Sequence, residues 1–589
     1  MTGRNGSCVW TMLSLAAAAL WLTASAARAQ EAPAGNAQPR LQLVADEALP
    51  NPFAPETAAA QRPSVDAAEK LAFASRLKLQ PLRSLAVSNG GRVKILDTLA
   101  RESVRFLTGR KNFLAYLPAE DGGVRKAKFD PLFTFLDLMI DPRFYDDKPL
   151  VHVEFLPLRR ALLAAQGLSP QEQERWLKLT RLSPAMIASS FAAVAQERAT
   201  SPGFGKALER TQQQMSLLSH AHRTLLLVAP DDDASPWLHV SSSKTPGEVK
   251  EAFGKLGAAW RARDATAANE AIERIAALLP AINASRYPGV VRQVEAAYNR
   301  YAPFDWGAWL YGAAFLLLVL AFGIGRRRLV WSGTGALALA IMLHAAGFFA
   351  RWVIAQRLPI QNQFESLTGL SLAASAFGFG IMLRTRQWLF GAAAAGAGFL
   401  MLLVATTTGV PGETITREAA ILNTSVLLKY HVTSVLTSYG LITLGFILSC
   451  FYLWTYYGVR FKGAKAAALA AEGLNLPDRH GAHGSQRTLH DLDRAQTTVL
   501  QLAFWILGVG ILLGAWWADH SWGRWWAFDP KETWALVTWI VYLIVVHVRF
   551  TAGPKRGLLT AWLSVVGFFV MLWTYFGVNL LLPGLHAYA

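Results

Sequence analysis

The chain has 589 residues, of which 53% are hydrophobic and 16% charged, and its formal net charge is +17 at pH 7. A basic excess of this size suggests nucleic-acid binding only where it gathers on a folded domain. Here residues 30–303 carry a small positive excess, and much of the remainder lies in short loops between the apolar runs that follow residue 304. The pattern excludes a nucleic-acid partner and favours a membrane protein with an exported domain.

The first 30 residues have the parts of a secretory signal. Arg4 supplies a positive start, residues 16–21 are apolar, and Ala-Arg-Ala at 27–29 is a small-x-small cleavage site. We therefore expect a signal peptide over residues 1–29. The alternative is an uncleaved membrane helix, for which the apolar stretch is short. In either case the region that follows is exported.

The chain contains two cysteines, Cys8 within the expected signal and Cys450 inside an apolar run. The mature protein is therefore expected to have neither an internal disulfide nor a C-x-x-C redox pair. Any thiol chemistry must use the thiols of a partner protein.

The exported region is expected to have two parts. Residues 30–65, rich in Ala, Pro and Gln, predict a flexible leader. Residues 66–303 predict a mostly helical soluble domain, since few runs alternate with the period of a strand. Within it, VSNGGRVKILDTLARESVRFLTGR (87–110) pairs a Gly-Gly turn with an amphipathic helix that begins near Asp97. The Gly-Gly lacks the Lys-Ser/Thr pair and buried strand of a phosphate loop, so it predicts only a turn.

From residue 304 onward the apolar runs are long enough to cross a bilayer. Eight spans are expected, at 305–325, 330–353, 366–384, 387–408, 432–456, 498–517, 534–551 and 558–580. The loops with most of the Lys and Arg residues all fall opposite the exported domain, and positive loops stay in the cytoplasm. We therefore expect an all-α polytopic protein of the bacterial inner membrane, its soluble domain and C-terminus in the periplasm.

Seven tryptophans crowd into residues 516–539, WWADHSWGRWWAFDPKETWALVTW. An interfacial aromatic belt accounts for two or three of them, but not for a Trp-dense loop interrupted by a glycine, a charge and a proline. A flat aromatic platform edged by polar groups suits a flat, mostly apolar ligand. The loop at 516–534 is therefore the first candidate site, with Trp522, Trp525, Trp526 and Asp529 as its binding residues.

Four of the twelve histidines lie in or at the ends of the expected spans: His344, His431, His547 and His586. Ionisable residues in spans are costly and mark function by default. His431 begins the fifth span and His586 follows the eighth on the same outer side, so both should flank the Trp-rich loop. Two histidines can hold one haem iron from opposite faces. His344 and His547 lie deeper and suggest a second, buried pair, although their depths differ by about one or two helical turns.

At these residues the chain resembles the CcsA (ResC) family of cytochrome c biogenesis proteins, within the haem-handling group. WGRWWAFDPKETWAL (522–536) is similar to the family's tryptophan-rich signature, with Phe528 where Trp is usual. The other segments resemble the family's histidine segments and its N-x-Y-E-S segment, the latter with Phe364 for Tyr: YHVTSVLTSYG (430–440), VVHVR (545–549), VNLLLPGLHAYA (578–589) and NQFESLTGLSL (362–372). The resemblance covers about residues 305–589.

The resemblance implies that His431 and His586 ligate an outward-facing haem b on the Trp-rich loop. It implies that His344 and His547 hold haem within the membrane on its way out. The chain would then be a component of a cytochrome c haem lyase (synthase), to which apocytochrome c brings its C-x-x-C-H segment. The exported region does not resemble the CcsB (ResB) subunit, so such a subunit is an expected partner. NGGRVKILDTLARE (89–102) is similar to a segment of extended, fused members of the family.

Other functions stay open on the residues alone. A membrane b-type cytochrome in quinol electron transfer would explain the histidines without requiring a Trp-rich outer platform. A haem exporter would move haem without forming a bond, and a CcmF-type or CcmC-type role is a nearer rival. Asp529 and Glu532 are expected either to orient haem or substrate, or only to cap the helix that follows, where acidic groups suit the N-terminal end.

Overall fold

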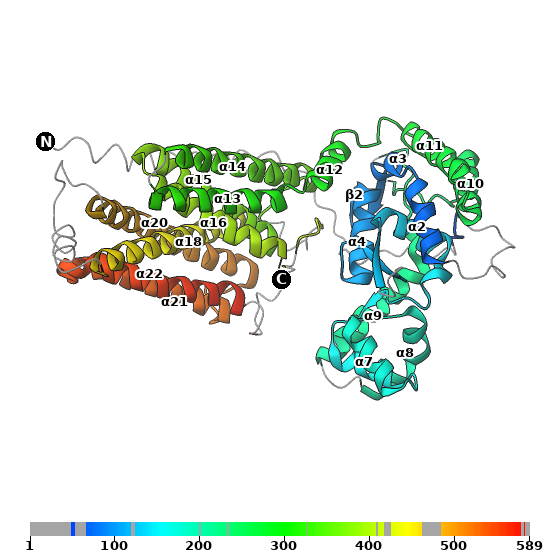
Figure 1. Ribbon diagram of the computed structural model, residues 1–589, viewed down its shortest axis with the longest axis horizontal. Coiled ribbons are helices and arrows are strands. Elements are labelled where there is room, and N and C mark those ends of the chain that lie inside the picture. Colours follow the sequence, from blue (N-terminus) through cyan, green and yellow to red (C-terminus); the bar gives the residue numbers. More distant parts are fainter. Residues whose placement is uncertain are drawn as a thin grey trace. The chain divides into compact units, whose positions relative to one another are not determined.

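The structure is a computed structural model. It describes residues 49–53, 66–118, 124–198, 202–232, 235–324, 327–407, 410, 412–416, 426–461, 485–578 and 582. The expected signal peptide, most of the expected leader, His586 and the side chain of Trp522 lie outside this description. The described residues fall into two compact units, one ending at Arg300 and one beginning at Tyr301 (Figure 1).

The first unit is mostly helical, which confirms the predicted class. Its longer helices are α2 (Ala67–Arg76), α4 (Leu96–Thr108), α5 (Pro131–Ile140), α6 (Leu156–Ala164), α7 (Pro170–Leu179), α8 (Pro184–Arg198), α9 (Pro202–His220), α10 (Gly247–Ala262), α11 (Ala265–Ala281) and α12 (Val290–Tyr301), and α3 (Gln80–Arg83) is a single turn. Its described strands form three antiparallel pairs: β1 (Ala86–Asn89) with β2 (Arg92–Ile95), β3 (Phe113–Pro118) with β4 (Val124–Phe129), and β5 (Val151–His152) with β6 (Arg181–Leu182).

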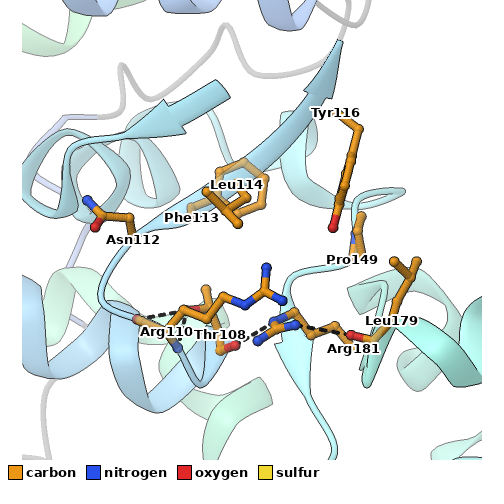
Figure 2. A pocket seen from close by; sticks show the side chains of 9 residues that line it. All are labelled: Thr108, Arg110, Asn112, Phe113, Leu114, Tyr116, Pro149, Leu179 and Arg181. Atoms are coloured by element: carbon orange, nitrogen blue, oxygen red, sulfur yellow. Dashed lines mark hydrogen bonds between the residues drawn. The ribbon is translucent and has the colours of Figure 1, made fainter. Parts of the chain in front are cut away.

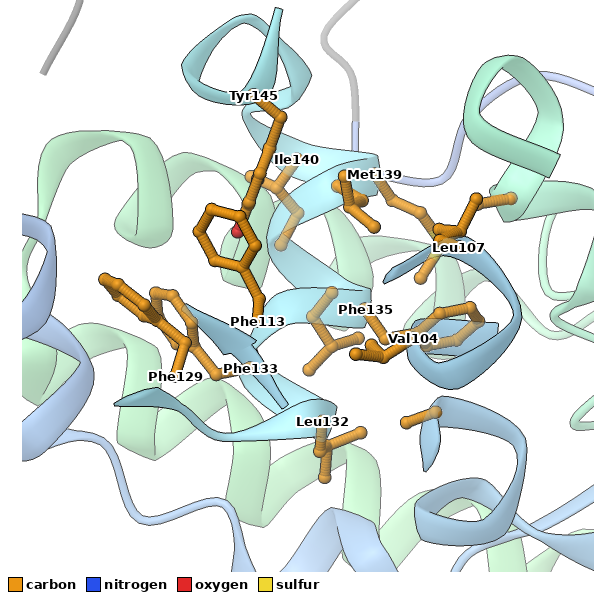
Figure 3. Packing of buried hydrophobic residues seen from close by; sticks show 14 of the residues in the cluster. Val104, Leu107, Phe113, Phe129, Leu132, Phe133, Phe135, Met139, Ile140 and Tyr145 are labelled. Carbon is orange, nitrogen blue, oxygen red and sulfur yellow. The ribbon is translucent and has the colours of Figure 1, made fainter. Parts of the chain in front are cut away.

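Aromatic side chains from β3, β4 and α5 fill the core of the first unit (Figure 3). Phe113 meets Tyr145 edge-on at 5.2 Å. The fully buried Asp137 accepts hydrogen bonds from Lys70 Nζ (2.7 Å), the Tyr145 hydroxyl (2.8 Å) and Trp260 Nε1 (2.9 Å). These bonds offset the free-energy cost of burying the carboxylate. Desolvation still raises the pKa of Asp137 above its usual range.

Residues 89–102 run from the turn of the β1–β2 hairpin into α4, and their side chains contact α12, the last helix of the first unit. The turn is made by Gly90 (φ 63°) and Gly91 (φ 77°), which adopt the left-handed conformation that hairpin turns require. This confirms the predicted turn. Glu295 of α12 is buried and accepts hydrogen bonds from the Arg92 guanidinium (3.1 Å) and the Thr98 hydroxyl (2.7 Å). Polar bonds therefore fasten α12 to the segment that follows the turn.

Among its described residues, the second unit contains eight helices long and apolar enough to cross a membrane, which confirms the predicted number. They are α13 (Pro303–Ile324), α14 (Arg327–Ala355), α15 (Gln363–Thr385), α16 (Trp388–Thr407), α18 (Val426–Phe461), α20 (Ser485–Trp522), α21 (Pro530–Thr551) and α22 (Arg556–Leu572). Helices α13–α16 pack together, α18–α22 form a second group, and α15 and α16 join the groups by packing on α18 (Figure 1). A π-helical turn, η4 (Trp573–Gly577), follows α22.

Small residues allow the close approach of the membrane helices. A side chain on Gly398 of α16 would lie 2.7 Å from both Tyr311 of α13 and Ser375 of α15. Without a hydrophobic driving force between helices in lipid, such van der Waals contact is a main source of their association. Glycine at 398 therefore lets α16 approach both α13 and α15 closely.

Candidate functional site

A cavity of about 430 Å³ lies where α15, α18, α20 and α21 meet the π-helical turn η4. This volume falls within the range of about 300–1,000 Å³ typical of small-molecule sites. Its deeper wall is apolar or aromatic and includes Val432, Val435, Leu436, Tyr439, Ile511 and Ala535. π-Helical turns occur frequently at functional sites, and Thr574 and Tyr575 of η4 also line this cavity. The cavity is therefore the candidate site of the membrane unit.

His431, in the second turn of α18, lines the cavity with one ring nitrogen already engaged. Its Nδ1 lies 2.7 Å from the carbonyl oxygen of Gly510, to which it donates when the proton is on Nδ1. In that tautomer Nε2 carries a lone pair, which is what a metal ligand requires, and second-shell bonds of this kind orient ligating histidines. A Cβ on Gly514 would lie 2.5 Å from the imidazole. Glycine at 514 therefore makes the space for this ring.

The Trp-rich segment is mostly helical, so the predicted loop at 516–534 is wrong in its extent. Helix α20 continues to Trp522, and the next helix begins at Pro530. Asp519 and His520 end the apolar run but not the helix, because backbone hydrogen bonding does not need apolar side chains. Gly523 ends it with φ 70°. The connecting loop is therefore residues 523–529.

Five of the seven tryptophans of this segment divide into two groups. Trp517, Trp525 and Trp526 line the cavity. Trp534 instead meets Trp573 edge-on at 5.8 Å, and Trp539 stacks on Phe504 at 5.0 Å. These last contacts belong to helix packing, so the tryptophans of the lining come from the end of α20 and from the loop. Phe528, where the family usually has Trp, is 78% exposed, and it is absent from the lining.

Asp529 and Glu532 form a capping box at the start of α21. Asp529 Oδ2 accepts the N–H of Lys531 (3.2 Å), and Glu532 Oε2 accepts those of Ala527 (2.8 Å) and Asp529 (3.3 Å). Such reciprocal bonds satisfy helix donors that otherwise lack partners. The geometry favours the capping alternative for both carboxylates, and capping also tethers the loop that carries Trp525. Asp529 is buried behind the lining, whereas Glu532 contributes to it.

The two deeper histidines occupy different surroundings. His344 is fully buried, with its Nδ1 3.3 Å from the Tyr311 hydroxyl and its ring edge-on to Phe304. His547 lies on the exposed face of α21, and its Nδ1 lies 2.8 Å from the carbonyl oxygen of Leu543. Their pairing stays a prediction, as does the role of His586.

An ion triad that sequence reasoning missed lies behind one wall of the cavity. Glu365 accepts from Arg351 Nε (3.0 Å) and the Arg357 guanidinium (2.8 Å), and all three side chains are buried. Arg351 also donates to the carbonyl oxygens of Gly412 and Glu413. The segments so joined contribute Gln361, Asn362, Gln363, Gly412 and Thr416 to the lining. The triad therefore holds this wall together.

A smaller cavity lies in the first unit, beside β3 and β6 (Figure 2). Its volume of about 10 Å³ is that of about one water molecule. The buried Arg181 in its wall donates to the carbonyl oxygens of Thr108 (2.6 Å) and Leu179 (3.0 Å). Desolvation, with a contribution from Arg110, lowers the pKa of Arg181 to about 10. This cavity is too small for a flat macrocycle.

The membrane unit is similar in sequence to known proteins. Residues 360–586 match the family described as cytochrome C assembly protein. CcsA of a Synechococcus strain is 32% identical over 295 residues, which cover 48% of this chain and 94% of that protein. CcsA of Parasynechococcus marenigrum is 32% identical over 307 residues, or 97% of its length. The chain belongs to the CcsA family of cytochrome c biogenesis proteins.

A longer relative extends the similarity beyond the membrane unit. Protein NrfI of Wolinella succinogenes is 27% identical over 526 residues, which cover 85% of this chain. The chain spans about half of NrfI, 53% of its length. This CcsA-family chain is therefore an extended member, with a role in cytochrome c biogenesis and haem handling.

The residues of the cavity fit haem as a substrate. An imidazole suits the iron, and indole faces with apolar side chains suit the macrocycle. His431 of α18 and Trp525 and Trp526 of the 523–529 loop are brought to one cavity. The donor chemistry therefore matches both the metal and the ring of a haem.

Proposed function

We propose that this chain presents haem b at the outer face of the bacterial inner membrane for covalent attachment to apocytochrome c. The observation that carries the proposal is the shared cavity of His431, Trp525 and Trp526. In the proposal His431 and His586 hold the iron, the tryptophans contact the porphyrin, and His344 and His547 hold haem on its way through the membrane. A CcsB-like subunit is a further proposed partner.

In the proposed reaction the protein positions reactants. Each thiol of a C-x-x-C-H segment adds across one haem vinyl group. A sulfur–carbon bond forms as the C=C double bond becomes single, and the thiol hydrogen ends on the other vinyl carbon. The addition needs no external oxidant or reductant. Holding the groups in register can lower the barrier by about 7–11 kcal/mol. The thiols come from the partner, because Cys450 is the one cysteine outside the expected signal peptide.

The first test is the reduced-minus-oxidised visible spectrum of the detergent-purified protein from a haem-replete host. We expect a b-type signal that falls in a His431→Ala, His586→Ala double variant. His520→Ala is the matched control, because His520 is an exposed histidine of α20 that bonds to the Trp516 carbonyl oxygen. Absence of haem from the wild type would refute haem handling at this site. A signal unchanged in the double variant would indicate that His344 or His547 ligates the iron, and it would favour a b-type cytochrome.

Ligase activity is tested with purified protein, haem and an apocytochrome c. Thioether formation should require both thiols of the C-x-x-C-H segment. Release of haem to an acceptor without cysteines, with no thioether formed on the normal one, would instead establish a haem exporter.

A further inference from the structure

The charged residues of the cavity lining differ in whether other groups of the protein bind them. The described lining contains Lys429, Lys531 and one acidic residue, Glu532. The Glu532 carboxylate accepts two backbone N–H groups of the loop, so it is committed to the helix cap. Asp529 attracts Lys531 electrostatically, but its carboxylate also caps α21. The cavity therefore presents two cations that form no ion pair with the described residues.

Neither lysine ammonium has an ion pair or hydrogen bond within the described part of the chain. Both lysines are half-buried. The arginines behind the wall contrast with them, since Arg351 and Arg357 share Glu365. Partly desolvated charges are costly unless they are paired. The protein thus neutralises the cations it buries and leaves two facing the cavity, where an anionic ligand would pair with them.

The lysines lie at the helix ends, and the apolar lining lies deeper. Lys429 is in the first turn of α18, and Tyr439 lies about 15 Å further along that helix at ~1.5 Å per residue. Lys531 is in the first turn of α21, directly after the loop that carries Trp525. The cavity is therefore amphipathic, with cations at one end and aromatic and aliphatic groups beyond them. A flat apolar ring with acidic groups along one edge matches this order.

We propose that Lys429 and Lys531 bind the two propionate carboxylates of haem and so set the orientation of the macrocycle in the cavity. The inference rests on the proposed function, because it takes haem as the ligand of this cavity. Charge-assisted hydrogen bonds between ammonium and carboxylate are stronger than neutral ones. The lysines would therefore select for free carboxylates, whereas His431 and the tryptophans would accept the ring whether or not the propionates are free.

The test compares haem with haem dimethyl ester, whose propionates are masked. Protein from a haem-deficient host is titrated with each compound in detergent and followed by the Soret band. We expect Lys429→Met and Lys531→Met each to weaken haem binding about 10- to 100-fold and to leave the affinity for the ester unchanged. Lys531→Arg should retain most of the affinity. Arg524→Met is the matched control, since it removes an exposed cation of the 523–529 loop, and this cation is not part of the lining.

The outcomes separate this inference from the proposed function. Equal losses for haem and ester would show that the lysines only support the cavity or anchor helix ends at the membrane surface. No loss for either compound would exclude contact with the propionates. Either result overturns the inference while haem still binds. If the wild-type protein bound neither haem nor the ester, the proposed function itself would be overturned.

Discussion

The ion triad behind the cavity wall makes a quantitative prediction about the substitution Glu365→Gln. Glu365 and Arg351 are both fully buried, and the carboxylate accepts four hydrogen bonds, from Arg351 Nε (3.0 Å), Arg357 (2.8 and 3.3 Å) and the backbone N–H of Gln361 (3.1 Å). The amide removes the charge and turns one acceptor into a donor that faces a guanidinium. We therefore expect two arginines to lose their counter-ion at once.

The expected loss follows from the burial of Arg351. Removing one partner of a buried ion pair costs about 3–5 kcal/mol, because the remaining charge is left uncompensated. Arg351 keeps its hydrogen bonds to the carbonyl oxygens of Gly412 (2.5 Å) and Glu413 (2.8 Å). We therefore expect the lower end of this range, about 3 kcal/mol. The loosened segments line the cavity, so haem affinity should fall as well.

Unfolding in SDS, followed by tryptophan fluorescence, measures the stability of the detergent-solubilised protein. Asp493→Asn is a matched control, because it breaks the ion pair with Arg549 (2.8 Å) about 26 Å along α20 from Gly510, at ~1.5 Å per residue. That variant should lose stability but bind haem normally once folded. In a double-mutant cycle, Glu365→Gln and Arg351→Met together should cost about 1–3 kcal/mol less than their sum. Strict additivity, or an unchanged SDS midpoint for Glu365→Gln, would refute the reasoning.

Two further predictions concern Gly514 and His239. Gly514→Ala places a methyl group 2.5 Å from the His431 ring, so the haem content of the purified protein should fall by about tenfold or more. The control Gly335→Ala, at an open helix position, should leave the haem content unchanged. Equal haem contents in the two variants would show that the His431 ring does not need the space at Gly514. Desolvation lowers the pKa of His239 below 6.5, and its Nδ1 accepts the Ser241 N–H. Its stabilising contribution is therefore present above pH 6.5 and lost as the pH falls through the folded-state pKa. Thermal unfolding of the full chain should show a fall in stability below pH 6.5, and this fall should be smaller in His239→Asn. Identical pH profiles for the wild type and the variant would refute this prediction.

The eight spans could be predicted because bilayer thickness imposes a length and an apolarity that few other segments share. Their ends could not, since a helix continues for as long as its backbone bonds are satisfied. Helix α20 shows the difference. The apolar run ends near Trp517, but the helix continues through Asp519 and His520 until Gly523 adopts positive φ. The predicted loop was therefore too long, and four of its six tryptophans are helical: Trp516, Trp517, Trp522 and Trp534.

The candidate site was predictable only in part. His431 and the loop tryptophans carry chemical signals of their own, and the structure brings them to one cavity. Arg351, Lys429 and Lys531 were not predicted as site residues. The principle that ionisable residues in spans mark function applies to Arg351, within the expected span 330–353, but not to Glu365, which directly precedes the expected span 366–384. Their partnership depends on tertiary contacts between α14 and α15, which a single sequence does not reveal.

The two sides of the cavity are built on different principles. One side is made of helices and of segments fixed by the buried Glu365 triad. The other is a loop of residues 523–529, with positive φ at both Gly523 and Phe528, tethered at one end by the capping bonds of Glu532. A side held by buried ion pairs resists displacement, whereas a short loop tethered by a helix cap can adjust to a ligand at little cost. Substitutions in the triad should therefore act first on stability, and those at Trp525 first on haem affinity.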